Sequence, residues 1–279
     1  MNPSVRRFIT SVPLLRETYY KARSIYNGRR MVREARKVFQ NIEDYSRAIM
    51  EERPGQRLDL YMHDGLRFTV RQNGRDAAVL AEVFLDLEYT SGFQLPENSI
   101  VIDIGGYIGD FAIYAAKYLK AKKVITIEPS PQNFALLEAN VRNNDFQDRI
   151  IALQKAVTDG KSAKMNVDTA ETNQMRVSAY YGSSHGELKD VPGISLAQIM
   201  KDYNLPTIDL LKIDCEGGEY VILLTAPVEI LRATHIIVFE YHEIDNFAAM
   251  LADVKKRLVA EGFVLEIRGR GRNLVSATR

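Results

Sequence analysis

The chain of 279 residues has one cysteine, no tryptophan and almost no net charge. A single cysteine cannot form an internal disulfide, which excludes a disulfide-stabilised scaffold and favours a reducing compartment. No apolar run reaches the length of about 18 residues that a membrane-spanning helix needs. The N-terminus has Arg6 and Arg7, but Arg16 and Glu17 interrupt any apolar stretch of signal-peptide type. We therefore expect a cytoplasmic protein with a hydrophobic core of ordinary size.

The small net charge hides two segments of opposite sign. Residues 1–57 hold 13 Lys and Arg against 6 Asp and Glu, a balance of +7. Residues 58–279 hold 24 against 30, a balance of −6. Clustered basic residues often only solvate the outer face of a helix, but they also attract anionic partners. Both interpretations stay open for residues 1–57, the second with an anionic acceptor or a membrane surface, where the protein would be peripheral.

Residues 1–57 are predicted to form a helical extension. Apolar residues recur there at three- and four-residue steps, which predicts an amphipathic helix of about 20 residues through Ala35, Val38, Ile42, Tyr45 and Ile49. A less regular helix is predicted near residues 8–26. Residues 58–98 follow as a hairpin around Asp64-Gly65 and a helix over residues 75–88.

From residue 99 onward, apolar strands alternate with amphipathic helices, which predicts a largely parallel sheet covered on both faces. Strands are predicted at residues 99–104, 123–127, 150–155, 208–213, 235–240, 264–267 and 274–277. Helices are predicted at residues 108–119, 131–143, 195–203, 219–224 and 247–260. The fold class is therefore α/β, a Rossmann-like, seven-stranded, mostly parallel sheet with an antiparallel edge strand and a helical N-terminal extension. The polar segment 160–193 is interpreted as a long loop of the lid or substrate-binding kind.

A glycine-rich turn follows the first of these strands, in Val-Ile-Asp-Ile-Gly-Gly-Tyr-Ile-Gly-Asp-Phe, residues 101–111. Ligands bind at this place in open α/β sheets, because glycines allow close approach and a helix start offers free N–H groups. Tyr107 stands where a dinucleotide-binding turn has its second glycine, and its side chain would crowd a pyrophosphate. The motif favours a smaller adenosine ligand, although it also fits a tight turn without a ligand.

Glu128 follows the next predicted strand, 25 residues after Asp103. An acidic residue at about this distance from a glycine turn is placed to accept hydrogen bonds from both ribose hydroxyls. The alternative is a charge that stabilises the start of the helix after Pro129. The pairing with the glycine turn favours ribose recognition.

A third segment makes the chain resemble class I S-adenosylmethionine methyltransferases of the FkbM family. The family's strand end K-I-D-x-E-G-x-E is matched by Lys212, Ile213, Asp214, Glu216, Gly217 and Glu219. Similarity extends to Arg75-Asp76 with Glu82-Val83-Phe84, and to Phe239-Glu240-Tyr241-His242. It covers about residues 65–278 and departs from the family at Ser195-Leu196-Ala197, which lacks an acid, and at Gly106-Tyr107, where smaller residues are common.

The resemblance implies S-adenosylmethionine as methyl donor and an acceptor hydroxyl on a glycan, glycolipid or secondary metabolite. It divides residues 58–279, the methyltransferase domain, into the hairpin and helix of residues 58–98 and a cofactor-binding core, residues 99–279. Asp103, Gly105 and Gly109 would frame the methionine end, and Glu128 the ribose. The backbone around residues 155–157 would line the adenine. The full set of implied cofactor-binding residues is Asp103, Gly105, Gly106, Tyr107, Gly109, Glu128, Pro129, Ser130, Ala156, Val157 and Asp214.

An alcohol must lose a proton when it accepts a methyl group, so a base or a metal should lie nearby. The candidates at adjacent strand ends are Asp214, Glu216, Glu240 and His242. A lone histidine is more often structural than functional, but carboxylates surround His242 in the predicted site, so both roles stay open for it. Asp214, Glu240 and His242 also offer ligands for a hard divalent cation, although such ligands are non-specific. Glu219 is interpreted as a charge at the start of its short helix.

Two other functions compete with O-methyl transfer. The basic N-terminus and the arginine run at residues 268–272 are compatible with an RNA methyltransferase. No RNA-binding module is visible, however, so a nucleic-acid partner is not expected. The second alternative is a ligand-binding protein without catalysis, against which the acidic residues at positions 103, 128 and 214 argue. The oligomeric state is open, and a homo-oligomer is compatible with the sequence.

Overall fold

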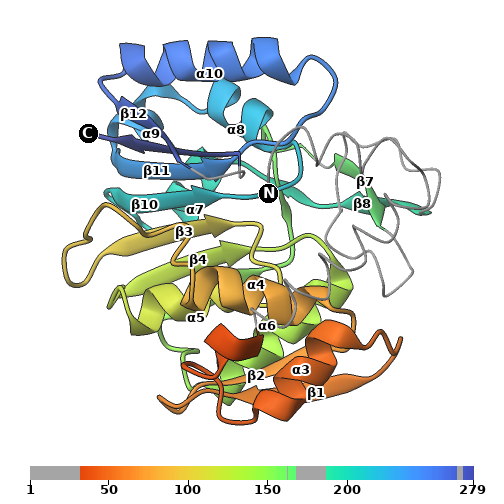
Figure 1. The fold of residues 1–279 in the computed structure, drawn as a ribbon. Helices are drawn as coiled ribbons and strands as arrows, with labels where there is room; N and C mark the ends of the chain where they lie inside the picture. Colours follow the sequence, from red (N-terminus) through yellow and green to blue (C-terminus); the bar gives the residue numbers. More distant parts are fainter. Residues whose placement is uncertain (1–31, 162, 168–186, 269–272) are drawn as a thin grey trace, which may run out of the picture. The chain divides into compact units, whose positions relative to one another are not determined.

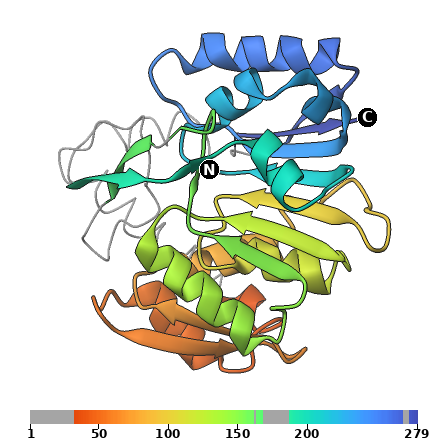
Figure 2. The same cartoon turned by 180° about the vertical axis from the view of Figure 1, so that it is seen from behind.

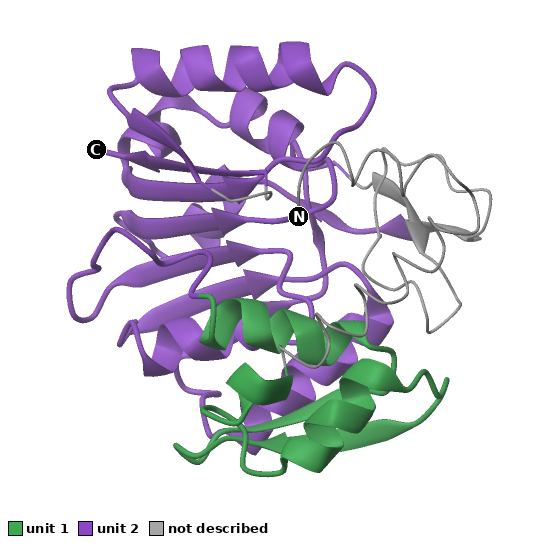
Figure 3. Cartoon of the chain, in the orientation of Figure 1, with its two compact units in different colours: residues 1–86 green, residues 87–279 purple. Residues whose placement is uncertain are grey.

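The computed structural model describes residues 32–161, 163–167, 187–268 and 273–279. The chain divides into two compact units, residues 1–86 and residues 87–279 (Figure 3). The boundary predicted from the sequence lies after residue 57, so the structure groups the hairpin and its following helix with the N-terminal unit instead. The helix predicted near residues 8–26 lies outside the described residues.

In the described part of the first unit, from residue 32 onward, helices pack against a hairpin. The hairpin strands β1 (Arg57–Tyr61) and β2 (Arg67–Arg71) pair antiparallel, as the alternation of apolar residues predicts. Helix α3 (Ile42–Met50) packs against β1, and α4 (Arg75–Phe84) packs against β2. Leu60, Phe68 and Val70 are fully buried and form the core of the hairpin.

The single helix predicted through residues 35–49 is wrong, because the chain leaves the helical path before α3 begins. Phe39 forms an isolated antiparallel bridge with Met62 beside the hairpin, and both side chains are buried. The Phe39 ring also stacks on Tyr45, with 4.6 Å between the ring centroids. The bridge to Met62, which joins residues distant in sequence, outweighs the local preference for a continuous helix.

The second unit is built on the predicted seven-stranded sheet (Figure 1). Its spatial order is β12 (Val264–Arg268), β13 (Leu274–Thr278), β11 (Thr234–Glu240), β10 (Ile208–Ile213), β3 (Ile100–Ile104), β4 (Lys123–Ile127) and β5 (Ile150–Leu153). The strands from β11 to β5 are all parallel. Strand β13 runs antiparallel to both β11 and β12, so the antiparallel strand stands one place inside the edge.

Helices connect these strands and cover the sheet (Figures 1 and 2). One set joins β3 to β4 and β4 to β5: α5 (Asp110–Lys117) and α6 (Pro131–Asn143). The other set accompanies the strands on the far side of β3: α7 (Leu196–Asp202), α8 (Glu219–Thr225) and α10 (Phe247–Ala260). From β3 the chain first adds β4 and β5 on one side, and it then adds β10 and β11 on the other side. Because crossovers between parallel strands are right-handed, the two sets of helices lie on opposite faces of the sheet. On the second face, Tyr220 and Val254 share a buried core with Ile213 and Phe239.

Three short features escaped the sequence pattern. Helix α9 (Val228–Arg232) precedes β11, and β6 (Ala156–Val157) pairs with β9 (Gly193–Ile194). Strand β7 (Ala163–Val167) pairs antiparallel with β8 (Glu187–Val191), within the segment 160–193 that was expected to be a loop. The centre of that segment lies outside the described residues. Among the helices that the structure describes, none combines the length and the apolar character needed to cross a bilayer.

Candidate functional site

The predicted polar residues follow the carboxyl ends of neighbouring parallel strands. Glu128 comes after β4, Asp214 comes after β10, and Glu240 ends β11. The ends of these strands meet at one edge of the sheet because the strands are parallel and paired through β3. Open α/β sheets bind ligands at this edge, so the topology gathers the predicted residues where a site is expected.

The glycine turn after β3 is shaped by close contacts within the protein. Gly105 has a φ of +83°, and a Cβ atom there would lie 1.7 Å from the main-chain oxygen of Asp214. A Cβ atom on Gly106 would lie 2.1 Å from Thr126 Oγ1. Tyr107 follows with a φ of +45°, a left-handed conformation that costs a non-glycine residue about 1–2 kcal/mol. The turn therefore needs glycine at two positions for its own packing, and it touches the end of β10.

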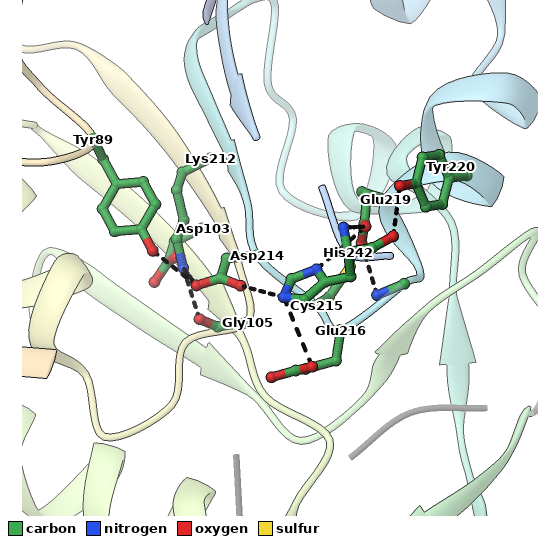
Figure 4. Close-up of polar contacts among 11 residues, drawn as sticks. Tyr89, Asp103, Gly105, Lys212, Asp214, Cys215, Glu216, Glu219, Tyr220 and His242 are labelled. Atoms are coloured by element: carbon green, nitrogen blue, oxygen red, sulfur yellow. Dashed lines mark hydrogen bonds and ion pairs between the residues drawn. The ribbon is translucent and has the colours of Figure 1, made fainter. Parts of the chain in front are cut away.

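Lys212, on β10, joins this turn to the acidic residues around it (Figure 4). Its Nζ atom donates a hydrogen bond to the Gly105 carbonyl oxygen at 2.9 Å and lies 3.2 Å from Asp103 Oδ1. It also lies 4.0 Å from Asp214 Oδ2 and 5.1 Å from the ring centroid of Tyr89. Burial alone would lower the pKa of Lys212, but the surrounding carboxylates raise it above its ordinary value. The amine is therefore charged throughout the physiological range.

Asp103 is fully buried beneath the turn. Its Oδ2 atom accepts a hydrogen bond from the Thr126 hydroxyl at 2.8 Å, and Oδ1 faces Lys212. Burial raises the pKa of Asp103, and the ion pair with Lys212 opposes that rise. The carboxylate thus supports the turn through Lys212 and presents no exposed surface to a ligand. Asp110, the first residue of α5, is also buried, which raises its pKa to about 7.

Glu128 is held rigidly after β4 and is only 5% exposed. Its Oε2 atom accepts the Tyr107 N–H at 3.0 Å, and Oε1 accepts the Ser130 N–H at 3.0 Å and the Asn133 side-chain amide at 3.2 Å. A carboxylate offers about four acceptor positions, so about one remains, on Oε2, for a ligand hydroxyl. Burial raises the pKa of Glu128 to about 7. Pro129 and Ser130 lead into α6, and Ser130 caps that helix.

The other predicted cofactor positions contribute backbone. Gly109 has a φ of +85°, precedes α5, and donates its N–H to the Gly106 carbonyl oxygen at 2.7 Å. Ala156 and Val157 form β6, whose backbone pairs with β9. The structure therefore joins Gly109 to the glycine turn, whereas it places Ala156 and Val157 in a separate small sheet.

Asp214 lies between two groups of side chains (Figure 4). Its Oδ2 atom accepts a hydrogen bond from the Tyr89 hydroxyl at 2.8 Å, and its Oδ1 atom lies 3.8 Å from His242 Nε2. The side chain is 27% exposed, so it remains open to a ligand. Tyr89 was missed by sequence reasoning because it lies 125 residues from Asp214 and belongs to no motif.

His242 stands among three carboxylates. Its Nδ1 atom lies 3.2 Å from Glu219 Oε1, and its Nε2 atom lies 3.7 Å from Glu216 Oε2 and 3.8 Å from Asp214 Oδ1. Burial lowers the pKa of His242, but the hydrogen bond to Glu219 and the neighbouring negative charges raise it to about 9. At neutral pH the ring is therefore protonated. Glu219 was expected only to charge its helix, and its contact with His242 was missed.

Glu240 and Glu216 complete the predicted catalytic set. One ligand atom from each of Asp214, Glu240 and His242 lies within 4.8 Å of the other two. Glu216 has a φ of +52°, a strained conformation of the kind that clusters at functional sites. All four residues that were predicted to be catalytic thus come together at one place.

Comparison with known proteins places the chain among methyltransferases. Residues 103–265 match the sequence profile of the Methyltransferase FkbM domain. Methyltransferase 1 of Beauveria bassiana (strain ARSEF 2860) is 25% identical over 210 residues, which are 67% of this chain and 78% of that protein. Methyltransferase sdnD of Sordaria araneosa is 25% identical over 193 residues, 59% of this chain and 74% of that protein.

Among solved structures, the chain is similar to the crystal structure of methyltransferase FkbM from Methylobacillus flagellatus KT. It aligns with a TM-score of 0.49 and 13% sequence identity. The alignment covers 72% of this chain and 48% of that chain, so this protein spans about half the length of the solved one.

Proposed function

The chain belongs to the FkbM family of methyltransferases, and from that premise we propose that it transfers a methyl group from S-adenosylmethionine to a hydroxyl group. The proposed acceptor is a small molecule, namely a glycan, glycolipid or secondary metabolite. The reaction is an in-line displacement at the sulfonium methyl group, in which positioning supplies much of the rate.

The observation that carries this proposal is the contact between the glycine turn and the end of β10. Gly105 packs directly on the main chain of Asp214, so no side chain separates the turn from that residue. A methyl donor held at the turn would therefore lie beside the Asp214 carboxylate, which is partly exposed. Donor binding and the removal of the acceptor proton would then occur at adjoining groups.

The residues around the turn fit S-adenosylmethionine. Its ribose would bond to the open acceptor position of Glu128, and the main chain of Gly105, Gly106, Tyr107 and Gly109 would border its methionine end. Asp103 would not touch the cofactor, and it would support the glycine turn through its ion pair with Lys212. Pro129 and Ser130 would lie beside the ribose, and Ala156 and Val157 would line the adenine. When bound, the cofactor supplies an electrophilic methyl group, and the protein supplies its orientation.

We assign to Asp214 the removal of the proton from the acceptor hydroxyl. Its Oδ1 atom faces His242 at a distance longer than a hydrogen bond, which leaves it available to a hydroxyl group. Tyr89 and Lys212 hold the opposite side of the carboxylate. His242 and Glu216 would border the acceptor hydroxyl, and Glu240 would lie next to them.

A labelled-methyl assay tests the function. The protein is incubated with S-adenosylmethionine tritiated on the methyl group, with methyl hexosides in one sample and total transfer RNA in another. We expect label in a hexoside, as a base-stable methyl ether, and none in the RNA. Labelled RNA would replace this proposal by RNA methylation. Cofactor binding by calorimetry without transfer to any hexoside would overturn a sugar hydroxyl as the acceptor, and no binding would overturn the whole proposal.

Cofactor affinity is expected to rise with pH between about 6 and 8. Burial raises the pKa of Glu128 to about 7, so the carboxylate becomes ionised across this interval. An ionised carboxylate accepts stronger hydrogen bonds from ribose hydroxyls than a protonated one does. Glu128→Gln should remove the pH dependence and weaken binding at pH 8 by at least ~10-fold, the value of a charge-assisted hydrogen bond. Calorimetric titration of S-adenosylmethionine at several pH values measures both effects.

Glu138→Gln is the matched control for this experiment, since Glu138 is exposed on α6. It should keep the affinity and the pH dependence of the unmodified protein. A Glu128→Gln protein that binds with the same pH dependence as the unmodified protein would contradict the assignment of the ribose to Glu128.

The sequence also led to hypotheses that stay predictions. They are the divalent cation at Asp214, Glu240 and His242, the contact of residues 1–57 with an anionic or membrane surface, the homo-oligomer and the cytoplasmic location. Transfer that stops on addition of EDTA and returns with Mg²⁺ would support the cation.

A further inference from the structure

We infer that Glu219 is a positioning residue of the methyl-transfer site, whose buried carboxylate aims the His242 ring at Asp214 and Glu216. The inference rests on the proposed function, because it concerns the residues beside the acceptor hydroxyl. Glu219 would then do more than stabilise the start of its own helix. The inference is argued from the contacts of its two carboxylate oxygens.

The first oxygen of Glu219 binds His242 twice. Glu219 is the first residue of α8 and has no exposed surface. Its Oε1 atom accepts the His242 main-chain N–H at 2.7 Å and lies 3.2 Å from Nδ1 of the ring. A carboxylate of this kind accepts and does not donate, so the proton in the second contact belongs to Nδ1. The ring is thereby fixed with its other nitrogen, Nε2, toward Asp214 and Glu216 (Figure 4).

The second oxygen anchors the carboxylate to the turn that carries Glu216. Oε2 accepts the Gly217 N–H at 2.9 Å. The Tyr220 hydroxyl, from the next residue of α8, donates to the His242 carbonyl oxygen at 2.7 Å. His242 is therefore held at its N–H, its carbonyl and its ring by one short stretch of α8. A residue that only stabilised the helix start would need the contact with Gly217 and none of the contacts with His242.

Burial makes this arrangement sensitive to the loss of the charge. A buried carboxylate is costly unless it is paired and hydrogen-bonded, and Glu219 finds those partners in His242 and Gly217. Removing the carboxylate frees the ring to rotate away from Asp214. In serine proteases, the carboxylate that orients the catalytic histidine contributes strongly to kcat.

Glu219→Gln and Glu219→Ala separate positioning from structure. In protein labelled with ¹⁵N at histidine, the His242 Nδ1–H should give a downfield, slowly exchanging resonance, identified by its loss in His242→Gln. We expect Glu219→Gln to shift this resonance upfield and Glu219→Ala to abolish it. With the hexoside that takes up label, kcat should fall at least ~10-fold in Glu219→Ala and less in Glu219→Gln. The dissociation constant for S-adenosylmethionine should stay within about threefold.

The chain offers a matched control in a second histidine–carboxylate pair. His235 Nδ1 lies 3.1 Å from Asp209 Oδ1, at the amino ends of β11 and β10. Asp209→Asn should leave both the His242 signal and kcat as they are. A Glu219→Ala protein that is less stable but keeps the His242 resonance and kcat would overturn the inference. The resonance is read without any acceptor, so a failure of the proposed function would not be mistaken for a failure of this inference.

Discussion

Replacement of Asp214 by Asn is expected to lower kcat for methyl transfer by ~100-fold or more, which is the usual contribution of a positioned general base. The carboxamide keeps the size of the side chain and can still accept the hydrogen bond from the Tyr89 hydroxyl. It loses the ability to take a proton from the acceptor hydroxyl. Binding of S-adenosylmethionine should weaken by less than about tenfold, since the turn and Glu128 provide its other contacts. Tritium transfer to the hexoside and calorimetry measure the two effects separately.

Asp209→Asn makes the same chemical change at the opposite end of β10. It removes a charge that accepts the Ile100 N–H at 2.7 Å, so some stability is expected to be lost, but kcat should not change. Asp214→Asn with unchanged kcat would show that another group takes the proton. Weaker cofactor binding with an unchanged kcat at saturating cofactor would place Asp214 in binding alone.

The sheet and its polar edge were predictable because both depend on local sequence. Apolar runs such as residues 208–213 mark buried strands, and the residues that follow parallel strands must share one edge. The sequence alone therefore predicts that Glu128, Asp214, Glu240 and His242 lie in one region. The contact of the turn with Asp214 was not predictable. A glycine in the sequence indicates that a side chain does not fit, but it does not indicate which neighbouring atom excludes it.

Contacts between distant segments account for what the sequence did not indicate. Tyr89 reaches Asp214 from outside every motif, and Phe39 interrupts the helix predicted through residues 35–49 by pairing with Met62. The ion pair of Lys212 with Asp103 links two separate motifs, and spacing along the chain contains no sign of it. Local patterns thus specify the elements and their ends, whereas the partners of each polar side chain depend on how the elements pack.

Lys212→Met is expected to lower the free energy of unfolding by about 3–5 kcal/mol, the cost of leaving one member of a buried ion pair without its partner. Methionine matches the length of the lysine stem but provides no charge. Asp103 would remain fully buried with the Thr126 hydroxyl as its hydrogen-bond donor, and the Gly105 carbonyl oxygen would lose its bond to Nζ. Thermal unfolding should shift down by about 10 °C, at roughly 2–4 °C per kcal/mol for a domain of this size. Cofactor affinity should fall as well, because the turn loses its tie to β10.

The pH dependence of this defect distinguishes an unpaired charge from poor packing. Without Lys212, the pKa of Asp103 should rise further in the folded protein, while the unfolded value stays ordinary, near about 4. Burial already raises this pKa in the unmodified protein. The defect should therefore grow as pH rises from the folded-state pKa of Asp103 in the unmodified protein towards its higher value in the variant, and it should shrink on acidification. The double variant Asp103→Asn with Lys212→Met removes both charges and should be more stable than Lys212→Met alone at pH 7. If the double variant is no more stable, or if the defect is the same at pH 5 and pH 8, the loss comes from packing around Lys212 and not from the buried charge of Asp103.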